Sequence, residues 1–164
     1  MILIYSGRGK GKTSACIGQA IRALGSGLEV AFGQFMKRPG KAGEQAVLES
    51  LLGKRFFAAG AGFFRSESQR PEQREKTLLV LEWAFRQKAE MLVLDEALLA
   101  LERGLLHKDE LFPLVEDRVT GRHLVLSGPV IPDWLLTRAG IITEMRKITH
   151  ALDSGMPPIC GIEY

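Results

Sequence analysis

A glycine-rich segment only a few residues from the start of the chain constrains the fold most. Residues 6–14 read SGRGKGKTS and directly follow the short, apolar, β-favouring run at 2–5. Residues 13–24 then place apolar side chains at helical spacing, up to a break at Gly25. A strand, a glycine-rich turn and a helix in this order are typical of the phosphate-binding loop G-x-x-x-x-G-K-[ST]. The segment therefore predicts an α/β fold with a phosphate site near its beginning.

The rest of the chain continues the alternation of strands and helices. We expect strands at 28–35, 55–59, 91–94, 123–126 and 141–145, and helices at 44–52, 71–87, 97–101, 108–116 and 133–138. The unbroken apolar run at 91–94 is typical of a strand buried on both faces. The pattern predicts a P-loop NTPase-like (RecA-like) fold, with a mainly parallel β-sheet flanked by helices in three layers. A length of 164 residues fits a single domain spanning 1–164.

Composition excludes several function classes. Apolar residues make up 46% and charged residues 25%, and the net charge of +3 suits an anionic ligand without demanding nucleic acid. No apolar run approaches 18 residues and the opening is too short for a signal-peptide core, so we expect a cytoplasmic protein that does not cross a membrane. Cys16 and Cys160 lack the spacing of a zinc site or a disulfide framework.

The glycine-rich loop has the groups that a triphosphate needs. Its backbone N–H groups and the start of the following helix can converge on phosphate oxygens, Lys12 adds a positive charge, and the Thr13 hydroxyl can bind Mg²⁺. A βα turn without a ligand is the alternative, but unpaired lysines in such a turn would repel each other. The candidate nucleotide-binding residues are Gly7, Arg8, Gly9, Lys10, Gly11, Lys12, Thr13 and Ser14.

Asp95 and Glu96 follow the buried strand at 91–94. At the carboxyl edge of a parallel sheet, such carboxylates complete a magnesium shell opposite the phosphate loop, so Thr13, Asp95 and Glu96 are the candidate metal ligands. In a hydrolase, Glu96 could instead activate water. The alternative is that the pair caps the helix expected at 97–101.

Six short segments recur in the order of one known family. They are SGRGKGKTS at 6–14, QFMK at 34–37, GF at 62–63, VLDE at 93–96, TEMRKITHALDSG at 143–155 and the ending GIEY at 161–164. Together they resemble the P-loop family of ATP:corrinoid adenosyltransferases over essentially the whole chain, from Ile2 to Tyr164. The C-terminal segments are the most specific, because a generic ATPase has no reason to carry them. Members of this family commonly have Ser or Thr where this loop has Ser6.

The resemblance implies a reaction and its participants. Such enzymes transfer the 5′-deoxyadenosyl group of ATP to Co(I) of a reduced corrinoid such as cobalamin and release triphosphate, with Mg²⁺ or Mn²⁺. It implies catalytic roles for Lys12, Thr13 and Glu96, and ATP bound in reversed orientation along the loop. It also implies an electron donor such as a flavodoxin-type reductase, and a homodimer in many members.

The corrinoid contacts implied by the resemblance are Phe35, Phe63 and Phe64. In the family, an aromatic pair near Phe63 helps to remove the lower axial ligand of cobalt, which makes reduction to Co(I) easier. The second aromatic position is Arg65 in this chain. The alternative for Phe63 and Phe64 is simple packing into a satellite cluster.

Two further departures from the family pattern lie after the strand expected at 123–126 and before the strand expected at 141–145. Pro129 replaces an expected arginine and Gly140 an expected aspartate, and the N-terminal extension of many members does not precede Ile2. These departures predict an altered corrinoid preference or a weakened activity, with another segment serving as the lid. The alternative functions are a small P-loop ATPase or kinase of other purpose, and a catalytically weak homologue that binds nucleotide or corrinoid.

Overall fold

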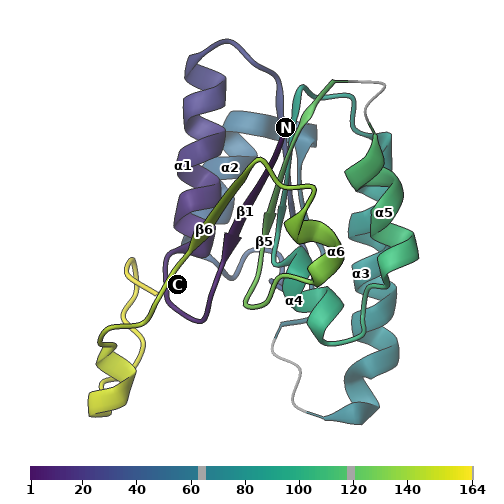
Figure 1. The fold of residues 1–164 in the computed structure, drawn as a ribbon. Helices are drawn as coiled ribbons and strands as arrows, with labels where there is room; N and C mark the ends of the chain where they lie inside the picture. Colours follow the sequence, from purple (N-terminus) through teal and green to yellow (C-terminus); the bar gives the residue numbers. More distant parts are fainter. Residues whose placement is uncertain (63–65, 118–120, 164) are drawn as a thin grey trace.

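The structure is a computed structural model that describes residues 1–62, 66–117 and 121–163. Strands and helices alternate along the chain, as the sequence predicts (Figure 1). The strands are β1 (Ile2–Ser6), β2 (Val30–Gln34), β3 (Phe56–Ala58), β4 (Met91–Asp95), β5 (His123–Ser127) and β6 (Ile141–Glu144). The α-helices are α1 (Lys12–Gly25), α2 (Gly43–Leu52), α3 (Arg70–Arg86), α4 (Ala97–Glu102), α5 (Lys108–Glu116) and α6 (Asp133–Leu136).

All six strands belong to one parallel sheet in the order β3-β2-β4-β5-β1-β6. The register pairs Val30 with Met91 and Ile2 with Leu124. The predicted parallel sheet is thus confirmed, and element ends differ from the predicted ones by at most two residues. Because every strand runs the same way, all the loops that follow strands open at one edge of the sheet.

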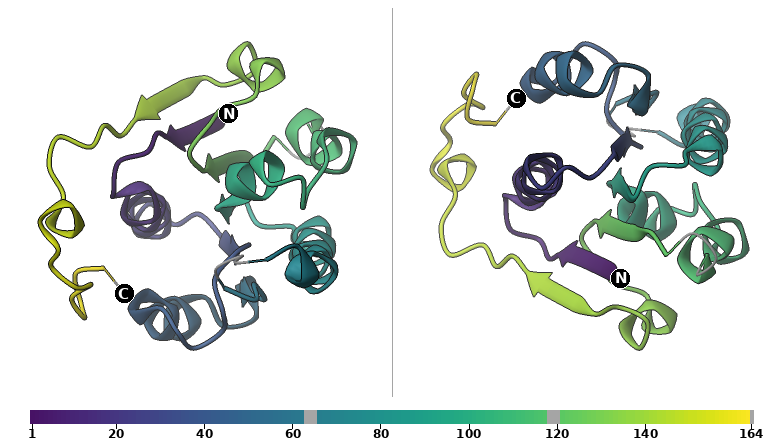
Figure 2. Two further views of the ribbon diagram at one scale, coloured as in Figure 1. Left: turned by 90° about the horizontal axis from the view of Figure 1, so that it is seen from below. Right: turned by 90° about the horizontal axis from the view of Figure 1, so that it is seen from above.

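Apart from the edge strand β6, the sheet is covered on both faces, and successive apolar residues of its strands alternate between two cores. One core lies under α1 and α2 and contains Cys16, Leu48, Phe32 and Val93. The other lies under α3, α4, α5 and α6 and includes Leu92 and Leu94 from the same strand β4. Figure 2 shows the two groups of helices on opposite sides of the sheet. The three-layer prediction is therefore confirmed.

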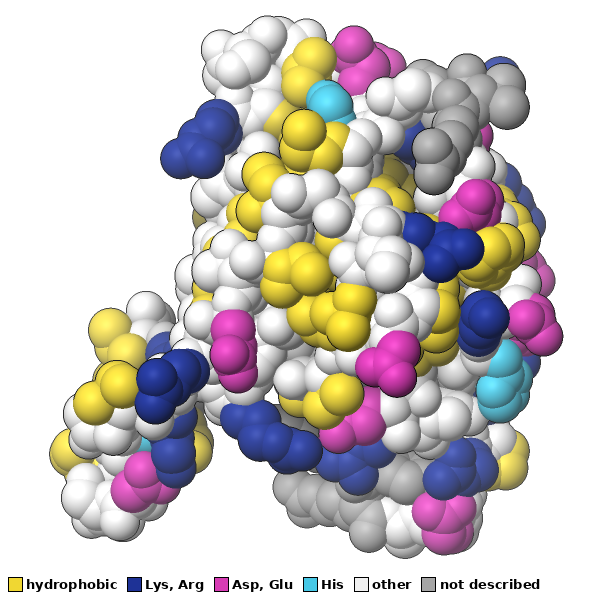
Figure 3. Space-filling view, in the orientation of Figure 1, with side chains coloured by type: hydrophobic (Ala, Val, Ile, Leu, Met, Phe, Trp, Pro, Cys, Tyr) yellow, Lys and Arg dark blue, Asp and Glu magenta, His cyan; other side chains and the backbone are white. Residues whose placement is uncertain are grey.

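The C-terminal segment leaves this layered body after β6. β6 is an edge strand with all four residues exposed, and it pairs with β1 alone. Residues 145–163 then pass the N-terminal end of α1 and reach toward α2 (Figures 1 and 2). They include the short 3₁₀ helix Ala151–Ser154. Figure 3 shows this segment standing away from the body, with basic and apolar side chains on its surface.

No helix in the described parts of the chain is long and apolar enough to cross a membrane.

Candidate functional site

The glycine-rich loop joins β1 to α1 at the carboxyl edge of the sheet. Gly7 and Gly11 have φ of +102° and +111°, a backbone conformation that strongly favours glycine. Ser6, in contrast, is the last residue of β1, and its carbonyl accepts a 2.8 Å hydrogen bond from the Met145 N–H as the pairing with β6 ends. The position that holds the first glycine of the motif therefore has ordinary strand geometry here and needs no glycine.

The segment after β6 lies directly against the loop. The Gly9 N–H donates to the Met145 carbonyl at 2.8 Å, and a Cβ built on Gly9 would lie 2.6 Å from that same oxygen. The Gly7 N–H donates to the carbonyl of Pro129 at 3.2 Å. Two of the loop's backbone donors thus have partners within the chain, and Gly7 and Gly9 also permit the close approach of Met145.

Lys12 begins α1 and folds back over the loop. Its Nζ donates to the carbonyl oxygens of Gly7 and Gly9, at 2.7 Å each. Partial burial lowers the pKa of Lys12, and the nearby charges of Glu96 and Asp95 offset only part of that effect. The ammonium therefore lies at the helix N-terminus, where a phosphate would also be favoured by the helix dipole.

Asp95 ends β4 and is fully buried. Its carboxylate accepts hydrogen bonds from the hydroxyl groups of Ser127 at 2.7 Å and Thr13 at 3.1 Å, and from the Gln34 amide at 3.3 Å. The ammonium of Lys37 lies 3.2 Å from the same carboxylate. Because burying a carboxyl group is costly without polar partners, these groups together offset much of the cost of placing Asp95 in the interior.

Glu96 adopts φ +62°, and it is the one residue other than glycine with positive φ among those described. Its N–H donates to Ser127 Oγ at 2.8 Å, and its side chain makes no capping hydrogen bond to α4. The helix-cap alternative for the acidic pair therefore does not hold. Burial, followed by the charge of Asp95, raises the pKa of Glu96 to about 7.

The donor set suits a divalent cation. The Thr13 hydroxyl and the Asp95 carboxylate lie 3.1 Å apart, and the ammonium of Lys37 contacts both. Within the described residues no group of three or more His, Cys, Asp or Glu could hold a metal ion by itself. Mg²⁺ takes few protein oxygens and completes its shell with substrate phosphates and water, so the Thr13 hydroxyl and the Asp95 carboxylate are ligands of the kind that it uses.

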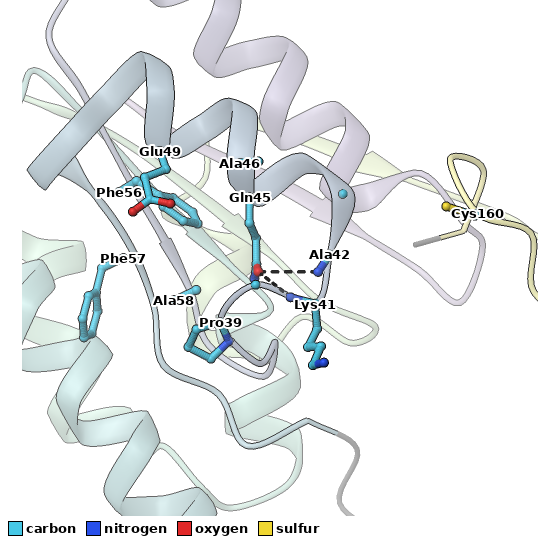
Figure 4. Close-up of a pocket in the computed structure, with 12 residues that line it drawn as sticks. Pro39, Lys41, Ala42, Gln45, Ala46, Glu49, Phe56, Phe57, Ala58 and Cys160 are labelled. Atoms are coloured by element: carbon cyan, nitrogen blue, oxygen red, sulfur yellow. Dashed lines mark hydrogen bonds between the residues drawn. The ribbon is translucent and has the colours of Figure 1, made fainter.

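A polar chain leads from Asp95 to the loop before α2. The Gln34 amide donates to Glu44 as well as to Asp95, and its own oxygen accepts a 2.9 Å bond from Gln45. Gln45 Oε1 in turn accepts from the N–H groups of Lys41 and Ala42, as the dashed lines in Figure 4 show. This loop borders a cavity of about 520 Å³, which is also lined by Phe56, Phe57 and Cys160.

The remaining predicted ligand residues lie in different surroundings. Arg8, Lys10 and Ser14 are exposed, and Arg8 pairs with Glu102 at 3.7 Å. Phe35, one of the corrinoid contacts that the resemblance implies, is 1% exposed and packs in the core under α3, because it continues β2 inward. Phe63, Phe64 and Arg65 lie outside the described residues, as does Tyr164.

Three site residues were not identified from sequence as parts of the metal site: Ser127, Glu44 and Lys37. Ser127 is a fully buried hydroxyl at the end of the apolar strand β5, and this polar residue at a strand end was the available signal. Lys37 and Glu44 bracket the basic loop before α2 and reach the site only because β2 lies beside β4.

Comparison with known proteins identifies the family of the chain. The family model described as "ATP:corrinoid adenosyltransferase BtuR/CobO/CobP" matches residues 1–164. The chain belongs to this family. A corrinoid adenosyltransferase of Pseudomonas aeruginosa is 30% identical over 173 residues, covering 100% of this chain and 83% of the relative. The Salmonella typhimurium protein named corrinoid adenosyltransferase CobA is 30% identical over 168 residues, covering 100% and 85%.

A solved structure supports the fold of this adenosyltransferase family member. A KaiC-like protein of Pyrococcus horikoshii aligns with a TM-score of 0.53 at 15% identity, over 90% of this chain and 74% of that one. At such identity the likeness concerns the fold, which is that of the P-loop NTPases. The predicted family and fold class are both confirmed.

Proposed function

We propose that this protein transfers the 5′-deoxyadenosyl group of ATP to Co(I) of a corrinoid and releases intact triphosphate. The observation that carries the proposal is the contact between two parts of the chain. The family-specific segment that contains Met145 lies on the phosphate loop through the Gly9–Met145 hydrogen bond of 2.8 Å. This contact supports a single site formed by the loop and the C-terminal segment together.

In the proposed reaction Co(I) attacks C5′ of ATP. The Co–C bond forms with the electron pair of cobalt, which becomes formally Co(III), while the C5′–O5′ bond breaks and its electron pair leaves on the triphosphate. The protein must therefore stabilise negative charge that grows on the leaving group. Lys12 and the N-terminus of α1 lie together at the loop and would provide that stabilisation.

Thr13 and Asp95 would hold Mg²⁺ or Mn²⁺, with Glu96 as the second carboxylate of the site. The metal would neutralise part of the triphosphate charge, which is chemistry that these side chains cannot supply themselves. Ser127 would orient the two acidic residues, because its hydroxyl contacts the Asp95 side chain and the Glu96 backbone at once. The other loop residues, including Arg8, Lys10 and Ser14, would line the path of the nucleotide in its reversed orientation.

We propose Phe63 and Phe64 as the corrinoid contacts, since Phe35 is occupied in the core. A homodimer is supported by the exposed apolar side chains of β6 and the C-terminal segment, among them Ile142, Ile148 and Ile162. We further propose a cytoplasmic location and reduction of cobalt by a flavodoxin-type donor, both of which follow from family membership. The domain that performs the reaction would span residues 1–164.

A small ATPase is the second candidate function, and one observation favours it. Glu96 has a pKa of about 7 beside the phosphate loop, which suits a general base for water.

An anaerobic assay separates the candidates. The protein is mixed with MgATP and chemically reduced cobalamin, and the absorbance spectrum is followed before and after exposure to light. Adenosyl transfer predicts a product whose Co–C bond is cleaved by light, with triphosphate as the other product. ADP or orthophosphate without this product would favour the ATPase. Binding of both ligands without either reaction would indicate a catalytically weak homologue.

A further inference from the structure

Lys37 places a positive charge at the candidate metal site. Its Nζ lies 3.0 Å from Thr13 Oγ1 and 3.2 Å from Asp95 Oδ2, the two atoms expected to bind the divalent cation. A third contact, to Glu44 Oε1, is 2.7 Å long. The side chain is 22% exposed, so the ammonium is largely removed from water.

An ammonium and a metal ion could not share this position. The Thr13 and Asp95 oxygens are 3.1 Å apart, and Nζ forms a nearly equilateral triangle with them. A Mg²⁺ ion about 2.1 Å from both oxygens would lie at most about 4 Å from Nζ, on whichever side it binds. Two cations that close in a largely buried site repel strongly. The arrival of the metal therefore requires Lys37 to move or the metal to bind more weakly.

We propose that Lys37 is the resident counterion of the metal-free site, and that a divalent cation must displace it to bind Thr13 and Asp95. The inference rests on the proposed metal site. In the structure the Lys37 ammonium forms an ion pair of 3.2 Å with the fully buried Asp95. By the proposal, Lys37 stabilises Asp95 while no metal is bound and lowers the affinity of the site for metal.

Glu44 gives the displaced ammonium a second anchor. It contacts Lys37 more closely than Asp95 does, 2.7 Å against 3.2 Å, and it lies in the first turn of α2 at the outer end of the polar chain. Lys37 can therefore leave Asp95 while keeping an anionic partner. The residues that follow Lys37 form the loop that borders the cavity in Figure 4. Displacement of Lys37 would therefore shift the backbone of this loop.

Mn²⁺ binding without nucleotide tests the proposal. Free Mn²⁺ is followed by electron paramagnetic resonance in the wild type, Lys37→Met, Lys37→Gln and the control Lys41→Met, which removes the same charge from an exposed position on the same loop. We expect both Lys37 variants to bind Mn²⁺ about tenfold more tightly, the scale of one hydrogen bond to a charged group. The metal-free Lys37 variants should melt at lower temperature and gain more from Mn²⁺ than the wild type. Lys41→Met should match the wild type.

Asp95→Asn separates failure of the inference from failure of the proposed site. If it abolishes Mn²⁺ binding while the Lys37 variants bind no more tightly than the wild type, the metal site stands and the role of Lys37 is refuted. If Asp95→Asn binds Mn²⁺ like the wild type, the proposed metal site fails and the inference falls with it. Equal tightening in Lys41→Met would also overturn the inference, because general loop charge would then be the cause. Lys37→Gln keeps the test usable if Lys37→Met does not fold.

Discussion

Ser127 joins the two acidic residues of the site, and its removal should be costly. The hydroxyl donates to Asp95 Oδ1 at 2.7 Å and accepts from the Glu96 N–H at 2.8 Å, and the residue is fully buried. Ser127→Ala removes both hydrogen bonds and leaves one carboxylate oxygen and one N–H with fewer partners. A hydrogen bond to a charged group contributes about 1.5–3 kcal/mol and a neutral one about 1 kcal/mol.

The expected loss is therefore about 3 kcal/mol in the free energy of unfolding. For a chain of this length that corresponds to a fall of about 6–12 °C in Tm. Urea unfolding and a thermal scan of the nucleotide-free protein measure both quantities. Ser14→Ala is the matched control, because Ser14 is exposed on α1 and its change should stay within about 0.5 kcal/mol. A loss under about 1 kcal/mol for Ser127→Ala would refute the assigned role.

Four further predictions test the loop, the helix that follows it and the thiols. Lys12→Ala should lower kcat/KM about 10²–10³-fold if its ammonium meets charge that develops on the triphosphate; near-native rates would refute that role. Gly7→Ala should lower stability by about 2 kcal/mol and abolish ATP binding, since its φ is +102° and its Cβ would overlap the Met145 carbonyl. In contrast, Gly18→Ala, whose Cβ meets no described atom within 4 Å, should stabilise α1 by about 1 kcal/mol. A thiol reagent should modify Cys160 but not the buried Cys16, whose pKa is raised by burial; two fast thiols in the native protein would contradict this.

The sequence was a good guide to the fold because its signals are local. Each strand of the sheet is a short apolar run, and glycine or proline marks many of the turns. The continuous run 91–94 therefore predicted the central strand β4 correctly. The phosphate loop was equally easy to predict, since its glycines, lysine and threonine all lie within residues 7–13. The unusual Ser6 needed the structure only to show that its φ is ordinary.

The surroundings of Asp95 were much harder to predict. Its partners come from α1, β2, the loop after β2 and β5, and they meet only because of the strand order β2-β4-β5-β1. Pattern alone does not reveal that order. The burial of Phe35 was equally hard to predict: the residue directly follows β2, and its side chain packs in the core under α3.

Adenosyl transfer as proposed releases the triphosphate whole. The most direct measurement is ³¹P nuclear magnetic resonance of a reaction with MgATP and Co(I) corrinoid, with the Co–C product counted by absorbance in the same sample. We expect one triphosphate for each Co–C bond formed. Orthophosphate or ADP that accumulates without a Co–C bond would contradict the account.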